Sequence, residues 1–226
     1  EAGPDRIALY HYAHLPHVFK PQRRILEADM PSSAEKLDML ALSIEQLCGA
    51  GYVYIGMDHF ARPGDDLASA QRQGRLHRNF QGYSTHADCD LIGLGVSSIG
   101  KVGDSYSQSV KELSQYYARI DQGLLPVHRG YRLNADDLLR REVISDLMCH
   151  GRIDFGKFET RHGICFTEYF AEALAQLDEH VRDGLLEIHH DALVLLPQGH
   201  LMMRSAAMAF DAYLGAEQKG LFSRTV

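Results

Sequence analysis

The sequence contains no tryptophan and only four cysteines, Cys48, Cys89, Cys149 and Cys165, among its 226 residues. The cysteines are scattered, and no two of them have a C-x-x-C spacing. Such a pattern excludes the disulfide framework of a small secreted domain and gives no iron-sulfur signature. We therefore expect reduced cysteines and a cytoplasmic protein.

Long apolar runs and an excess of positive charge are also missing. Runs such as residues 192–197 are far shorter than the roughly 20 residues of a membrane-spanning helix. The chain has 23 Lys and Arg against 30 Asp and Glu, a net charge of -7. This balance opposes attraction to the phosphates of nucleic acids. The sequence thus predicts neither a membrane nor a nucleic-acid partner.

Residues 1–133 have the pattern of an α/β domain. Three apolar runs predict buried strands: residues 7–12, 52–57 and 91–96. A helix is predicted between the first two, because Ser32 and Glu35 have the spacing of a capping box. A strand, helix, strand order typically builds a parallel sheet. The connection over residues 59–90 is predicted to be a long loop that carries binding groups.

Residues 134–226 predict a second, mostly helical domain. Asn134 is placed to cap a helix, a hairpin is expected to turn at His190-Asp191, and a last helix is expected over residues 198–213. This order is the outline of a winged-helix-like unit. Winged helices often bind DNA, but this part carries 9 Lys or Arg against 15 Asp or Glu. We therefore interpret it as a lid or packing domain.

The spacing of His11, His14 and His17 raises the question of a metal site. Such a site needs further ligands in a fixed geometry, and Pro16 would break any helix that aligned these side chains. Loop histidines that form hydrogen bonds are the favoured interpretation.

Four blocks of the sequence together resemble a known family. They are Tyr-Ala-His-Leu-Pro at 12–16, Ile-Gly-Met-Asp-His-Phe-Ala-Arg-Pro at 55–63, Leu-His-Arg-Asn-Phe-Gln-Gly-Tyr at 76–83 and Gly-Val-Ser-Ser-Ile at 95–99. In order and spacing they resemble the oxygen-independent coproporphyrinogen III oxidases, a family of radical SAM enzymes. The resemblance extends along the chain to Phe222-Ser223-Arg224.

The resemblance implies both a fold and a reaction. Residues 1–133 would be the C-terminal part of a partial (β/α)6 radical SAM barrel, and residues 134–226 the helical domain that follows it. In the family, a [4Fe-4S] cluster bound by CxxxCxxC cleaves S-adenosylmethionine to a radical that abstracts hydrogen from a propionate. Loss of CO2 and an electron then leaves a vinyl group. Two propionates of coproporphyrinogen III react, two S-adenosylmethionine molecules are used, and protoporphyrinogen IX is formed for haem biosynthesis.

The resemblance also assigns site residues. Ala13 and Ile99 match positions that contact S-adenosylmethionine, where apolar side chains would pack the adenosyl group. Arg62, Arg75 and Arg78 are our candidates for binding the substrate propionates, since guanidinium groups suit carboxylates. The alternative without a binding role is that these arginines form surface ion pairs with the neighbouring aspartates. No catalytic residue and no metal ligand is assigned.

The sequence departs from the family in having no CxxxCxxC, and it begins without Met. We therefore expect it to be the C-terminal portion of a longer protein, inert alone, whose parent is monomeric and uses an electron donor. The nearest alternative is a radical SAM protein that carries haem, but those relatives have a Tyr-Trp pair near the block at 76–83, and this chain has no Trp. A non-catalytic α/β binding module is the alternative from another class.

Overall fold

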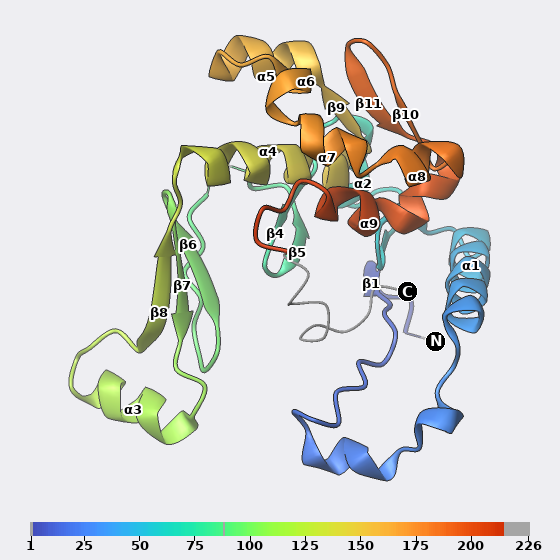
Figure 1. Ribbon diagram of the computed structural model, residues 1–226. Helices are drawn as coiled ribbons and strands as arrows, with labels where there is room; N and C mark the ends of the chain where they lie inside the picture. Colours follow the sequence, from blue (N-terminus) through green and yellow to red (C-terminus); the bar gives the residue numbers. More distant parts are fainter. Residues whose placement is uncertain (1, 88, 215–226) are drawn as a thin grey trace.

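The computed structural model describes residues 2–87 and 89–214 (Figure 1). A long helix, α4 (Ala135–His150), runs across the middle of the molecule. In Figure 1 the helices that follow it directly and the C-terminal hairpin lie above it, the last helix lies below it, and three separate β-rich parts also lie below it. The block Phe222-Ser223-Arg224 lies outside the described residues.

The N-terminal sheet has three short strands, β1 (Arg6–Ala8), β2 (Val53–Gly56) and β3 (His59–Ala61). Their order is β1-β3-β2, and β3 is antiparallel to both neighbours. The predicted parallel sheet is therefore wrong: β1 and β2 run in the same direction, but an antiparallel strand separates them. A two-residue turn, Met57-Asp58, folds the chain straight back, so that β3 lies between them. The described strands do not close into a barrel.

The predicted helix after the first strand is confirmed as α1 (Ser33–Gly49). Ser32 Oγ accepts the Glu35 N–H at 3.3 Å, and the Glu35 carboxylate accepts the Ser32 N–H at 2.8 Å. Both halves of the capping box are therefore formed. Two short 3-10 helices, η1 (Lys20–Arg24) and η2 (Glu27–Asp29), occupy the connection that leads to α1.

The prediction of one long loop over residues 59–90 is wrong. After β3 the chain forms α2 (Asp66–Arg72) and then a hairpin of β4 (His77–Asn79) and β5 (Gly82–Ser84). Asp65 caps α2 by accepting the Leu67 N–H at 2.7 Å. These elements are short, which is why their periodicity is weak in the sequence.

The predicted buried strand at 91–96 is also wrong. Leu91 makes an isolated bridge to Lys101, whereas Ile92 and Leu94 are 75% and 84% exposed. Gly93 permits a close approach of the backbone, because a Cβ there would lie 2.8 Å from the Ile99 carbonyl oxygen. The apolar run therefore leads to a strand rather than forming one.

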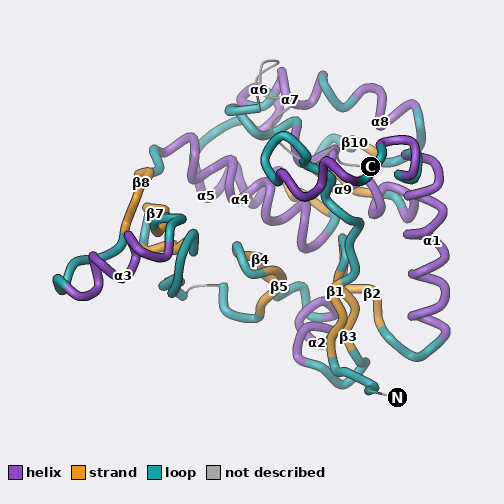
Figure 2. The backbone as a smooth tube through the Cα atoms, turned by 90° about the horizontal axis from the view of Figure 1, so that it is seen from below, coloured by secondary structure: helices purple, strands orange, loops and turns teal. Residues whose placement is uncertain are grey.

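Residues 99–132 form a projection that we call the arm. It consists of β6 (Ile99–Val102), β7 (Ser105–Ser109) and β8 (Val127–Arg132) in that order, with α3 (Leu113–Asp121) between the last two strands. In Figures 1 and 2 the arm stands apart from the N-terminal sheet. Every residue of β8 is exposed.

The C-terminal part confirms the winged-helix-like outline. After α4 the chain forms the elements β9 (Arg152–Asp154), α5 (Phe155–His162), α6 (Phe166–Tyr169), α7 (Ala171–Ala175), α8 (Asp178–Arg182), β10 (Leu186–Ile188), β11 (Ala192–Leu195), η3 (Pro197–Met202) and α9 (Met203–Met208). The hairpin of β10 and β11 turns where predicted, and β9 completes a sheet of order β10-β11-β9. The helix predicted over 198–213 is instead η3 followed by the shorter α9.

Aromatic side chains fill the core of this C-terminal part. Phe166 is fully buried and stacks on Phe155 with ring centroids 4.4 Å apart, while Phe158, Phe170 and Phe210 surround it. A second apolar cluster belongs to the N-terminal part, but it includes Cys149 of α4. The predicted domain boundary between residues 133 and 134 therefore stays a prediction, with α4 in contact with both clusters.

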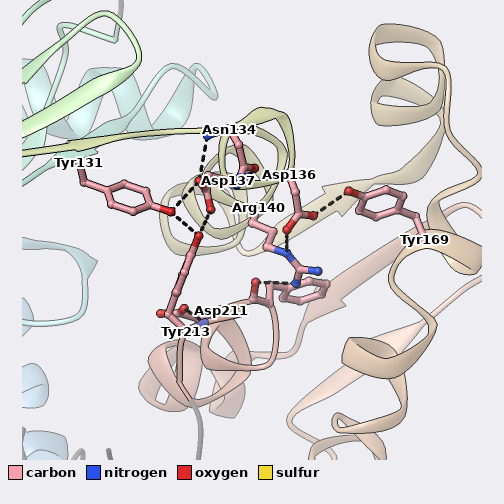
Figure 3. Close-up of polar contacts among 9 residues, drawn as sticks. Tyr131, Asn134, Asp136, Asp137, Arg140, Tyr169, Asp211 and Tyr213 are labelled. Carbon is pink, nitrogen blue, oxygen red and sulfur yellow. Dashed lines mark hydrogen bonds and ion pairs between the residues drawn. The ribbon is translucent and has the colours of Figure 1, made fainter.

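A polar cluster joins the arm to α4 and to the last described segment (Figure 3). Tyr213 Oη donates to Asp137 Oδ1 at 2.6 Å, and Tyr131 Oη, at the end of β8, donates to Asp137 Oδ2 at 3.3 Å. The hydrogen bond from Tyr213, followed by that from the Asn134 N–H, lowers the pKa of Asp137. The charged carboxylate thus acts as a common acceptor for three separate segments.

Replacement of Tyr213 by Phe should loosen the arm, because it removes one of the hydrogen bonds that surround Asp137. We expect faster amide exchange in residues 99–132, measured by hydrogen–deuterium exchange. Tyr169→Phe is a matched control, since Tyr169 donates to the adjacent Asp136 at 2.7 Å and does not contact the arm through this bond. Equal exchange in the arm of both variants and the unchanged protein would contradict the role of the cluster.

Candidate functional site

The turn between β2 and β3 has an unusual backbone. Gly56 has φ of +145° and Met57, which is not a glycine, has φ of +51°. The Met57 carbonyl accepts a hydrogen bond from Tyr54 Oη at 2.7 Å, which helps to hold this conformation. Strained backbone of this kind persists where the surrounding contacts enforce it, and it concentrates at functional sites.

Asp58, the second residue of the turn, forms a hydrogen-bonded pair with His59, the residue after it. His59 Nδ1 lies 2.8 Å from Asp58 Oδ1, and both side chains are partly buried. Burial alone would raise the pKa of Asp58, but the hydrogen bond and charge of His59, assisted by the charge of Arg78, lower it. Asp58 is therefore a carboxylate at neutral pH, and its backbone carbonyl also accepts the Leu9 N–H at 2.7 Å.

Two tyrosines enclose this ion pair. Burial, followed by the charge of Asp58, raises the pKa of Tyr54 to about 12. Burial also raises the pKa of Tyr83 well above its ordinary value, and its hydroxyl donates to the Met148 carbonyl at 2.8 Å. Both hydroxyl groups therefore stay protonated and act as hydrogen-bond donors rather than as acids or bases.

An open cavity of about 960 Å³ lies beside the turn. Its wall includes Met57 and Asp58, residues 9–15, the start of α1 and residues 201–205. His14 is on this wall, and its Nδ1 is buried without a hydrogen-bond partner among the described residues. The cavity therefore combines apolar walls with a carboxylate and imidazole groups, as ligand sites commonly do.

The structure places the two predicted S-adenosylmethionine contacts in different parts of the molecule. Ala13 is exposed on the cavity wall, and its carbonyl accepts a hydrogen bond from Gln22 Nε2 at 3.1 Å. Ile99 is half-buried at the start of β6 in the arm, where it pairs with Gln108. The side chains of Ala13 and Ile99 are thus carried by segments that are far apart in Figures 1 and 2.

The three predicted arginines have separate surroundings. The Arg62 guanidinium lies 4.1 Å from the ring centroid of Tyr52, and that of Arg75 donates to Gln73 on the surface. The guanidinium of Arg78 lies 5.4 Å from the ring centroid of Tyr83, next to the Asp58 ion pair. Only Arg78 is therefore brought to the turn by the fold.

Sequence reasoning did not assign roles to Asp58, His59 or Tyr83, although all three lie in the two longest blocks of the resemblance. The signal available was a glycine close before each of them: Gly56 precedes Met57-Asp58-His59, and Gly82 directly precedes Tyr83. In the structure both glycines have positive φ. A Cβ on Gly82 would lie 2.8 Å from His59 Nε2, so this glycine allows the β4–β5 hairpin to approach the ion pair.

Within residues 2–87 and 89–214, no three His, Cys, Asp or Glu side chains group so that they could hold a metal ion. In the same part of the chain, no helix has the length and apolar composition to cross a membrane.

Comparison with known proteins gives the class of this chain. Residues 133–202 match the family model described as the HemN C-terminal domain. In structure, the chain is similar to coproporphyrinogen III oxidase from Escherichia coli, which is described as a radical SAM enzyme. The TM-score is 0.88 at 47% identity, and the match covers 94% of this chain and 49% of that one.

Curated relatives define the family more closely. The oxygen-independent coproporphyrinogen III oxidase of Pseudomonas aeruginosa is 48% identical over 99% of this chain and 48% of its own length. That of Thermostichus vulcanus is 43% identical over 99% of this chain and 69% of its own length. The chain belongs to the oxygen-independent coproporphyrinogen III oxidase family, as the resemblance predicted, and it spans about half the length of the first relatives that it matches.

The strained turn gives a testable prediction. In Gly56→Ala the new Cβ would lie 2.6 Å from Tyr83 Oη, at a φ that disfavours alanine. We expect the free energy of unfolding to fall by about 1–3 kcal/mol, measured by denaturant titration. Gly64→Ala is the control, because its Cβ would meet nothing within 4 Å. A Gly56→Ala protein as stable as the control would show that the turn is not constrained.

Proposed function

We propose that this chain forms the substrate-facing part of an oxidative decarboxylase that converts two propionates of coproporphyrinogen III to vinyl groups, giving protoporphyrinogen IX in haem biosynthesis. The observation that carries the proposal is the similarity to oxidases of this name over nearly the whole chain, in sequence and in fold. Each relative named above is an oxidase, which favours this function over the haem-carrying alternative.

S-adenosylmethionine and a [4Fe-4S] cluster are the cofactors that the proposal requires. Together they supply, when bound, the carbon radical that starts the reaction. The cavity beside the turn has the size of a cofactor site, and Ala13 on its wall would pack against an adenosyl group. Ile99 would contact S-adenosylmethionine from the arm. The described residues do not fit the cluster, since they offer no cysteine ligand set, and we assign it no residue of this chain.

The work of this chain in the reaction is to bind and orient the substrate. An unpaired carboxylate is costly to bury, so each enclosed propionate needs a cationic partner. We propose Arg62, Arg75 and Arg78 for this role. Arg78 has the strongest support, because it is partly buried beside the turn. The proposal also includes a separate electron donor, a monomeric parent protein and a cytoplasmic location.

The activity can be tested with the natural gene product that contains this sequence. Reconstituted without oxygen and supplied with S-adenosylmethionine and a reductant, it should convert coproporphyrinogen III to protoporphyrinogen IX and release CO2. Product analysis by chromatography and mass spectrometry measures this. Transfer of haem to an acceptor protein with no decarboxylation would instead support the haem-carrying alternative.

The assignment of Ala13 can be tested separately. In the same protein, Ala13→Trp should fill the cavity wall and weaken S-adenosylmethionine binding about tenfold or more while the fold persists. Isothermal titration calorimetry measures the affinity, and circular dichroism the fold. Ala41→Trp, at an exposed position of α1, is the control for adding the same side chain. Unchanged affinity in a folded Ala13→Trp protein would refute the assignment.

A further inference from the structure

Two arginines each have a buried nitrogen atom without an acceptor in the part of the chain that the structure describes. Arg78 Nε and Arg141 Nη1 are both enclosed, and neither has a hydrogen-bond partner among the described residues. A buried donor that is left unpaired costs free energy, and the cost is greater when the group is charged. Native proteins rarely leave such groups unsatisfied, so each one calls for an explanation.

Other arginines of the same region are paired. Arg140, the neighbour of Arg141, donates to Asp136 at 2.8 Å and to the Phe210 carbonyl at 3.1 Å (Figure 3). Arg161 pairs with Glu142 and Arg6 with Asp65. Acidic partners are therefore available in this acidic chain, and among the arginines of the described residues a buried nitrogen without an acceptor is found at Arg78 and Arg141.

Both unpaired arginines belong to the seam between the β4–β5 hairpin and α4. Strand β4, which carries Arg78, is in contact with α4, which carries Arg141. The hairpin is fixed to α4 by the bond from Tyr83 to the Met148 carbonyl. The two guanidinium groups thus come from two elements, β4 and α4, that contact each other.

Aromatic rings accompany both guanidinium groups. Arg141 lies 6.0 Å from the ring centroid of Tyr106 in the arm, and Tyr106 meets Phe80 edge to face at 5.1 Å. Phe80, at the tip of the hairpin, is 51% exposed although it is large and apolar. The seam therefore combines an exposed aromatic side chain with two guanidinium groups that each keep one buried nitrogen without an acceptor among the described residues.

We infer that Arg141 and Arg78 form a carboxylate-binding pair for the substrate, with Phe80 and Tyr106 as the surface on which the ring system of the substrate rests. Guanidinium groups bind carboxylates through two parallel hydrogen bonds, and aromatic rings suit a pyrrole-based body. A tetrapyrrole with several propionates is the ligand class that matches both features. The inference rests on the proposed function and adds Arg141 as a residue that determines specificity.

The test replaces Arg141 in the natural gene product and follows coproporphyrinogen III turnover. Arg141→Gln should raise KM about tenfold or more with a much smaller change in kcat, because a charge-assisted bond to the bound substrate is lost. Arg129→Gln is the matched control. Arg129 is exposed on the arm, and its Nε already donates to Gln108 at 2.8 Å, so KM should stay unchanged.

A second readout separates binding from a structural role. The unchanged protein should bind coproporphyrinogen III more tightly than its tetramethyl ester, and Arg141→Gln should lose most of this preference. Arg141→Lys keeps the charge without the planar fork, so it should recover only part of the preference. If Arg141→Gln does not fold, the ester preference of Arg141→Lys decides the question in the same way.

The outcomes distinguish this inference from the proposed function. An active protein whose Arg141 variants keep the original KM and ester preference would overturn the role of Arg141 and leave the function intact. An unchanged protein that neither binds nor converts coproporphyrinogen III would overturn both. Loss of ester preference in the Arg141 variants but not in Arg129→Gln would support the pair.

Discussion

The position of Tyr83 is the constraint on which much of this structure depends. Its buried hydroxyl donates to the Met148 carbonyl of α4 and lies 3.9 Å from the Met203 sulfur of α9. Its ring meets His59 edge to face at 5.2 Å and lies beneath the Arg78 guanidinium. One side chain of β5 therefore contacts His59 after the β2–β3 turn, Arg78 of the neighbouring strand β4 and two C-terminal helices. The orientation of the C-terminal part relative to the candidate site follows from these contacts.

This arrangement explains why glycine is needed at positions 56 and 82. Gly56 leaves room for the Tyr83 hydroxyl, and Gly82 leaves room for the His59 imidazole. A side chain at either position would separate the turn from the hairpin and break the connection between Asp58, His59 and Arg78. The ionised Asp58, in turn, keeps a negative charge beside Arg78. Close approach of the backbone at Gly56 and Gly82 thus brings the turn and the hairpin together, and the charges of Asp58 and Arg78 then lie side by side. The cation is held by these short elements and not by a long flexible segment.

The sequence predicted those parts of the fold that rest on local signals. The capping boxes at Ser32 and Asn134 locate the starts of α1 and α4, and the β10–β11 hairpin turns as expected. Pairing between distant strands was not predictable, because no local feature reveals that β3 returns between β1 and β2. The apolar run at 91–96 misled for a related reason: hydrophobicity reports a tendency to be buried, not whether a partner surface lies nearby. The site shows the same division. Arg78 could be proposed from its chemistry, whereas Arg141 reads as an ordinary helix residue until the fold sets it against Tyr106.

Charge distribution explains why the site must act through short-range contacts. The chain has a net charge of -7, and residues 134–226 carry most of the acidic excess. The anionic substrate that we propose is therefore not attracted by the net charge of this chain, and beyond about 8 Å such repulsion is screened at physiological salt. Affinity for carboxylates has to come from guanidinium groups that are already oriented and partly shielded from water, where a hydrogen bond to an anion is strongest. In the proposed site, Arg78 and Arg141 meet this requirement because each keeps a buried guanidinium nitrogen, Nε of Arg78 and Nη1 of Arg141, without a hydrogen-bond acceptor among the described residues. In the proposed site, an acidic chain can select a polyanionic ligand through the positions of Arg78 and Arg141. Anions without an apolar body would bind less tightly, because they would leave the rings of Phe80 and Tyr106 uncovered.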